Sequence, residues 1–159
     1  MTKTSFIPDG YYTATPYLIV RGAVKAIDFY KQAFGAEELF RMPIPGSGPE
    51  TRIGHAEIRI GNSPIMLADE NLEMGARSPQ TLGGSPMSLL IYFPDCDAVF
   101  ARAIAAGAKA ERSVQDQFYG DRSGIVIDPF GHRWGIATHI EDVAPDEVQR
   151  RFEKICAAR

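Results

Sequence analysis

The chain is poor in cysteine and has no long apolar run, and each shortage excludes a class of protein. Cys96 and Cys156 form neither a CxxC pair nor a disulfide framework, so we expect a cytoplasmic protein with free thiols. No apolar run approaches the ~20 residues of a transmembrane helix, and residues 1–10 lack the apolar core of a signal peptide. A formal net charge of −3 gives no electrostatic argument for nucleic acid or a membrane as partner.

The signatures of several enzyme classes are also missing. The segment Pro45–Glu50, PGSGPE, lacks the Lys-Ser/Thr pair of a phosphate-binding loop and does not connect a strand to a helix. No Gly-x-Ser-x-Gly elbow is present. What remains is a composition of 45% hydrophobic and 23% charged residues, which is typical of a globular protein.

The order of predicted elements repeats once along the chain. Periodicity and turn residues predict β-α-β-β-β in the first half, and the same order in the second. The first set is Tyr12–Val20, the helix Val24–Phe34, Glu37–Met42, Arg52–Ile60 and Ser63–Ala68. The second set is Met87–Phe93, the helix Asp97–Ala106, Lys109–Val114, Ser123–Asp128 and Arg133–Thr138.

We therefore expect a single domain of residues 1–159 that contains two modules. The first module spans about 11–70 and the second about 87–140. The Gly-, Ser- and Pro-rich segment 71–86 is the predicted linker. A final helix is predicted over 145–157, with Pro145 near its first turn.

The segment Gln117–His139, QFYGDRSGIVIDPFGHRWGIATH, reads as loop, strand, Asp-Pro-Phe-Gly turn and strand. It resembles the closing hairpin of the vicinal oxygen chelate superfamily, which includes glyoxalase I, bleomycin-resistance proteins and extradiol dioxygenases. YGDRSGIVIDPFGHRW most resembles the PhnB-like branch. The resemblance covers about residues 11–140. It implies an α+β fold, with two βαβββ modules forming curved mixed sheets around a shared cavity and helices outside. It also implies a homodimer, with the modules paired within or between chains.

Strand alternation indicates which side chains face that cavity. Along Gly54–Ile60 the small and apolar side chains suit a helix-covered face, so His55, Glu57 and Arg59 should project to the other face. Near the chain's end, Trp134 is expected in the core, and Gly135 leaves room in the cavity.

The resemblance places the family's four metal-binding positions near Thr15, Met66, Ser88 and Gly135. None of these residues is a histidine or a carboxylate, which are the donors that divalent metals need in such sites. We therefore predict no metal cofactor. A divalent metal could still bind elsewhere if two H-x-E pairs met in space, and these pairs are His55 with Glu57 and His139 with Glu141.

Other side chains could bind a ligand or carry chemistry. His55 and Glu57 are candidate acid–base residues, although His55 could equally hold a cavity wall through Glu57 or a tyrosine. Arg122 could bind a carboxylate or phosphate, or could pair with Asp121 or Asp128. The predicted ligand-binding set is Thr15, Tyr17, His55, Arg59, Met66, Ser88, Tyr92, Tyr119, Arg122 and Gly135.

Two functions from different classes fit these observations. The first is a binding protein that holds a small organic molecule in a metal-free, largely apolar cavity, as bleomycin-resistance members do. The second is a lyase- or dioxygenase-type enzyme with an unusual site, in which His55, Glu57, Tyr119 and Arg122 take part.

Overall fold

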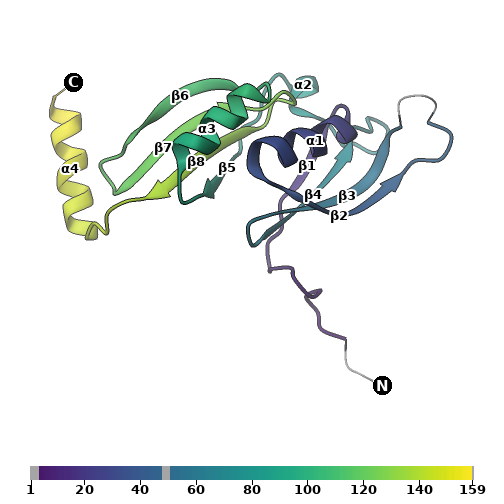
Figure 1. Ribbon diagram of the computed structural model, residues 1–159, viewed down its shortest axis with the longest axis horizontal. Helices are drawn as coiled ribbons and strands as arrows, with labels where there is room; N and C mark the ends of the chain where they lie inside the picture. The colour runs from purple at the N-terminus through teal and green to yellow at the C-terminus, as the bar shows by residue number, and fades with distance from the viewer. Residues whose placement is uncertain (1–3, 48–50, 159) are drawn as a thin grey trace. The chain divides into compact units, whose positions relative to one another are not determined.

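Two compact units make up the chain, and each repeats the same order of elements (Figure 1). The structure is a computed structural model that describes residues 4–47 and 51–158. Unit 1 comprises residues 1–85 and unit 2 residues 86–159, so the division falls at the end of the predicted linker. The expected α+β class and the two β-α-β-β-β modules are confirmed.

Each unit contains one four-stranded mixed sheet. Unit 1 contains β1 (Tyr17–Val20), α1 (Ala23–Phe34), β2 (Glu37–Pro43), β3 (Ile53–Ile60), β4 (Ser63–Asp69) and α2 (Pro79–Leu82). Unit 2 contains β5 (Ser88–Tyr92), α3 (Cys96–Ala105), β6 (Lys109–Asp116), β7 (Asp121–Ile127), β8 (Arg133–His139) and α4 (Pro145–Ala157). The strand orders are β1-β4-β3-β2 and β5-β8-β7-β6, and in each sheet only the first pair is parallel.

One helix covers one face of each sheet (Figure 1). Helix α1 buries Ile27 and Tyr30 completely, as their helical spacing predicts, and ends at Gly35 with φ 67°. In unit 2, α3 packs on β6, β7 and β8 so closely that a Cβ on Gly124 would lie 2.8 Å from the Phe100 ring. Helix packing therefore requires a glycine at position 124.

Strand β3 shows the predicted alternation between its two faces. Ala56 and Ile58 are fully buried, and Ile60 is 5% exposed. His55 and Glu57 on the opposite face are only half-buried. The face of the unit 1 sheet away from α1 is thus left open within that unit, which is the face predicted to carry the site.

A single buried carboxylate organises the turn between β7 and β8. Asp128 Oδ1 accepts hydrogen bonds from the backbone N–H groups of Phe130 and His132, each at 2.9 Å. Its Oδ2 accepts one from the indole N–H of Trp134, also at 2.9 Å. Trp134 is fully buried, so its predicted place in the core is confirmed. Asp128 therefore joins the turn to the core of unit 2.

Three local predictions need correction. Strand β1 begins at Tyr17 rather than Tyr12, because Pro16 cannot donate to a sheet and the residues before it do not pair; Thr15 consequently precedes the strand. The predicted linker contains the short helix α2, where the Ser78 side chain accepts a hydrogen bond from the Thr81 backbone N–H. Strand β7 begins two residues earlier than expected, at Asp121.

Helix α4 lies beyond the end of the second sheet and buries none of its residues (Figure 1). It contacts the loop between β6 and β7, where the rings of Phe152 and Phe118 have centroids 5.6 Å apart. Arg151 also binds Glu141 at 2.8 Å. None of the helices in the described ranges is both long and apolar enough to cross a bilayer.

We expect Asp128→Asn to destabilise unit 2. The amide can supply only one oxygen, so its NH₂ group would face either the Trp134 indole N–H or the two turn N–H groups. A buried donor left without an acceptor costs about 1–3 kcal/mol. Urea unfolding would measure the change, with Asp9→Asn at an exposed position as the matched control. Equal stability of the two variants would contradict this account of the turn.

Candidate functional site

The open face of unit 1 presents one row of side chains across all four strands. Tyr17 lies opposite Met66, Met66 opposite Glu57, and Glu57 opposite Phe40. Directly opposed residues share a face of a sheet, so these four project together. His55 projects from the same face, two residues before Glu57. Four predicted site residues are therefore brought together: Tyr17, His55, Glu57 and Met66.

A chain of hydrogen bonds joins the polar members of this face. The Tyr17 hydroxyl lies 2.8 Å from Nδ1 of His55, and Nε2 of His55 lies 3.1 Å from Oε1 of Glu57. The other Glu57 oxygen accepts a hydrogen bond from the Tyr11 hydroxyl. One tautomer satisfies the whole chain: Tyr17 donates to Nδ1, and Nε2–H donates to Glu57. Tyr11 was not a sequence candidate, because it lies outside any strand.

The protonation states of these groups follow from the same contacts. Hydrogen bonds from Tyr11 and then His55 hold the pKa of Glu57 below its usual value, so this carboxylate is charged at neutral pH. Burial, followed by the hydrogen bond to Glu57, raises the pKa of Tyr11 to about 12. Burial and the Glu57 charge also raise the pKa of Tyr17. Both tyrosines are therefore protonated donors.

Aromatic and apolar surface surrounds this polar chain. The His55 ring centroid lies 5.6 Å from that of Tyr17 and 6.2 Å from that of Phe40. Tyr17, Phe40 and Met42 are 48%, 48% and 50% exposed within this structure, which is high for large apolar side chains. An exposed apolar surface with a few fixed polar groups is the usual composition of a small-molecule site.

The open face of unit 2 has a different character. Leu90, Gly135 and Ile125 form one cross-strand row, and Tyr92, Ala137 and Ser123 form the next. A Cβ on Gly135 would lie 2.8 Å from a Leu90 methyl, so Leu90 fills the room predicted at this glycine. Ser88, exposed at the start of β5, belongs to the same face.

Tyr92 and His139 share one buried carboxylate. The Tyr92 hydroxyl and Nδ1 of His139 each lie 2.8 Å from an oxygen of Asp121, which is 5% exposed. The other His139 nitrogen lies 2.9 Å from Asp142. Hydrogen bonds to Asp142 and Asp121 raise the pKa of His139, and the one to Asp121 raises that of Tyr92.

Two predicted arginines are held by carboxylates. Arg122 binds Asp97 of α3 through two nitrogens, at 2.7 and 2.8 Å, and Asp116 through the third, at 2.8 Å. The predicted partners, Asp121 and Asp128, were therefore wrong, because alternation puts Arg122 on the helix-covered side of β7. Arg59 pairs with Glu37 at 2.5 Å.

Tyr119 lies in the loop between β6 and β7 and is 39% exposed. Its ring packs edge-on against Phe118, with centroids 5.2 Å apart. Phe118 in turn contacts Phe152 of α4, so Tyr119 belongs to the loop that packs against this helix.

The residues present do not suit the family's metal. Met66 and Gly135 project from the open faces as expected, but a thioether and a hydrogen supply no donor of the imidazole or carboxylate type. Over residues 4–47 and 51–158, no group of three or more His, Cys, Asp or Glu could hold a metal ion. In the alternative pair, Glu141 binds Arg151, and His139 binds Asp121 and Asp142.

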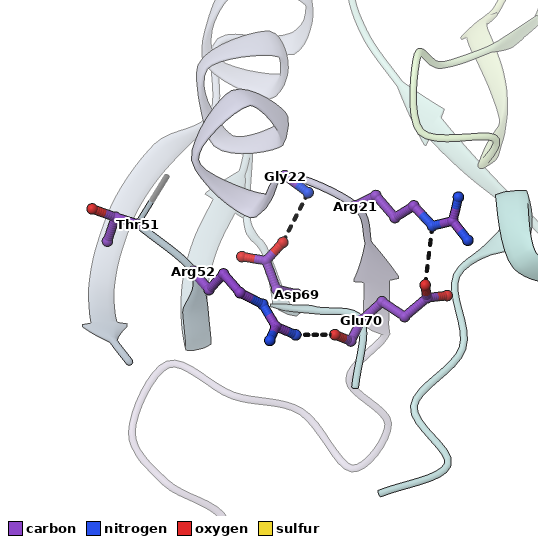
Figure 2. A pocket seen from close by; sticks show the side chains of 6 residues that line it. All are labelled: Arg21, Gly22, Thr51, Arg52, Asp69 and Glu70. Atoms are coloured by element: carbon purple, nitrogen blue, oxygen red, sulfur yellow. Dashed lines mark hydrogen bonds and ion pairs between the residues drawn. The ribbon is translucent and has the colours of Figure 1, made fainter. Parts of the chain in front are cut away.

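A pocket of about 280 Å³ in unit 1 was not predicted from the sequence. It lies at the start of α1, where Asp69 accepts hydrogen bonds from the backbone N–H groups of Gly22 and Ala23 (Figure 2). Its other lining residues are Arg21, Thr51, Arg52 and Glu70.

The charged side chains of this pocket are held by contacts within unit 1. Glu70 lies 3.0 Å from Arg21, and its backbone carbonyl accepts a hydrogen bond from Arg52 (Figure 2). Hydrogen bonds from Thr81, and then from the backbone N–H of Ser78, lower the pKa of Glu70 to about 2. These contacts attach the segment after β4 to unit 1, so we assign this pocket a structural role.

The fold defines a class, that of proteins built from two βαβββ modules. The family model described as the glyoxalase/bleomycin resistance protein/dioxygenase superfamily matches residues 12–136. The chain therefore belongs to this superfamily.

Several known proteins are similar to the chain. Protein Mb0911c of Mycobacterium bovis is 43% identical over 138 residues, which are 85% of this chain and 88% of that protein. The structure of the Arabidopsis thaliana At5g48480 product is 28% identical, with a TM-score of 0.59 over 80% of this chain and 98% of that one. A PhnB protein from Bacillus cereus has the same fold at 21% identity, with a TM-score of 0.62 over 80% and 99% of the two chains.

We expect the purified protein to retain almost no divalent metal. Protein prepared without chelator would be offered Ni²⁺, Zn²⁺, Mn²⁺ and Fe²⁺ in turn, desalted and analysed for metal per chain. Among the described residues no group of three or more His, Cys, Asp or Glu could hold a metal ion, and the pair His55 and Glu57 supplies too few donors for tight binding. Retention of about one metal per chain, lost in His55→Ala, would contradict this expectation.

Glu57 should make stability depend on acid pH. Its folded pKa is lower than its unfolded value, so its contribution is complete above the unfolded pKa and is lost as pH falls through the folded pKa. Between about pH 7 and about pH 3, the melting temperature should fall more steeply for the wild type than for Glu57→Gln. Parallel curves would show that the contacts to Tyr11 and His55 do not favour the charged carboxylate.

Proposed function

We propose that the chain binds a small organic molecule on the open face of unit 1, without a metal. The observation that carries this proposal is the Tyr17–His55–Glu57–Tyr11 chain of hydrogen bonds, surrounded by exposed aromatic surface. The proposal includes the homodimer and the cytoplasmic location that we expect from the resemblance and the cysteine usage.

The geometry suggests how such a ligand would be held. Tyr17 is half-exposed as a residue, and its hydroxyl proton is directed to His55, so its oxygen can accept a hydrogen bond from a ligand. The rings of Tyr17 and Phe40 offer flat apolar contact on either side of His55. Because Glu57 fixes His55, these groups need little reordering when a ligand binds.

An acid–base enzyme is the second candidate. His55 contacts a charged carboxylate at 3.1 Å, an arrangement that orients an imidazole for proton transfer. Arg122 and Tyr119, which we expected to assist, lie in unit 2 and are engaged with Asp97 and Phe118, respectively. Lyase and dioxygenase assays would separate the two functions: turnover that disappears in a folded His55→Ala variant would favour the enzyme.

The uncharged dye Nile red serves as a probe of the open face of unit 1. We expect Tyr17→Ala to weaken its binding about tenfold, because an aromatic contact worth about 1.4 kcal/mol is lost. Fluorescence titration measures the affinity. Phe6→Ala is the matched control, since that ring is 94% exposed and lies outside the sheet. Equal affinities of both variants and wild type would place binding away from this face.

A further inference from the structure

Arg112 is a charged residue on the open face of unit 2 that the sequence did not single out. On β6 it lies opposite Ile125 of β7, and Ile125 lies opposite Gly135 of β8. Its Nη2 donates a hydrogen bond to the Ser123 hydroxyl at 3.3 Å. Because Ser123 and Ile125 both face away from α3, the guanidinium lies on the same open face as Leu90.

The hydrogen-bonding capacity of Arg112 is largely unused. Its Nε is buried and has no partner in the described part of the chain. No carboxylate of residues 4–47 or 51–158 lies within ion-pair distance of its guanidinium, and Ser123 is its sole hydrogen-bond partner there. A buried N–H without an acceptor costs free energy, so the position of the Arg112 side chain is not explained by its contacts within the described chain.

Two other arginines of unit 2 have carboxylate partners, in contrast to Arg112. Arg122 is neutralised by Asp97 and Asp116, and Arg133, on the same open face, binds Glu111 at 2.6 Å. The one carboxylate near Tyr92, Asp121, is already shared between two donors. Among the described residues, no protein carboxylate balances the charge of Arg112 directly.

We propose that the open face of unit 2 binds an organic anion whose charged group is held by Arg112. A guanidinium presents a planar set of N–H donors that matches two oxygens of a carboxylate or phosphonate. Ser123 positions the guanidinium through Nη2. The apolar body of the ligand lies over Ile125 and toward Leu90, which is 56% exposed. This inference rests on residues of unit 2 alone and is independent of the proposed use of Tyr17 in unit 1.

Three probes with one phenyl body test the charge requirement. Phenylacetate carries a carboxylate, benzylphosphonate a phosphonate, and phenylacetamide is the uncharged counterpart. Isothermal titration gives the affinities, and the arginine Nε–Hε NMR signals report contact with Arg112. We expect at least one anion to bind about tenfold more tightly than the amide and to shift the Arg112 signal. The stronger of the two anions identifies carboxylate or phosphonate as the natural group.

Variants of Arg112 separate binding from folding. Arg112→Gln should weaken anion binding about tenfold or more, and Arg112→Lys should retain part of it, because charge remains without the planar donor set. Arg150→Gln removes the same charge from the exposed surface of α4 and should leave affinity unchanged. Arg112→Met removes the unpaired Nε–H with little change in shape, so it should lose binding while the melting temperature is maintained or raised.

Equal binding of the amide and both anions would overturn the proposal, as would undiminished anion binding in Arg112→Gln. The experiments distinguish failure of this anion-site proposal from failure of the proposal for unit 1. Nile red binding that depends on Tyr17, with anion binding indifferent to Arg112, would reject the anion site and retain the proposed function. The reverse pattern would retain the anion site alone.

Discussion

The uneven coverage of each sheet is the constraint on which the rest of the structure depends. A four-stranded sheet has two faces, and in each unit a helix, α1 or α3, packs on one of them. The strands must then alternate, with Ala56 and Ile58 under α1 and His55 and Glu57 on the other side. The open faces are therefore the surfaces left for function, and their composition decides what they can bind.

The polar groups of the open faces are held by one another. In unit 1 the ionised Glu57 fixes His55 and Tyr11, and in unit 2 the buried Asp121 fixes Tyr92 and His139. A carboxylate placed between donors keeps aromatic and imidazole side chains in one orientation on an otherwise apolar surface. Both units use this arrangement, although the donors and carboxylates stand at different positions in the two modules.

Superfamily membership fixes the scaffold and leaves the chemistry to particular side chains. At the centre of the open face, unit 1 carries Met66, which offers apolar contact. Unit 2 carries Gly135, against which Leu90 packs closely. Such residues suit recognition by shape and hydrogen bonding. An arginine without a carboxylate partner adds a charge requirement that the apolar scaffold alone would not impose.

The sequence by itself determined the two modules, the helix-covered faces and the turn at Asp128, because helical spacing, strand alternation and turn residues act over short stretches. It also singled out Tyr17, His55 and Glu57 as candidate site residues. Only the tertiary structure decided which charges are paired. Arg122 pairs with Asp97 of α3, which is 25 residues away in the sequence. Arg112 pairs with no carboxylate in the described chain. Such pairing depends on contacts between distant elements, which local patterns do not encode.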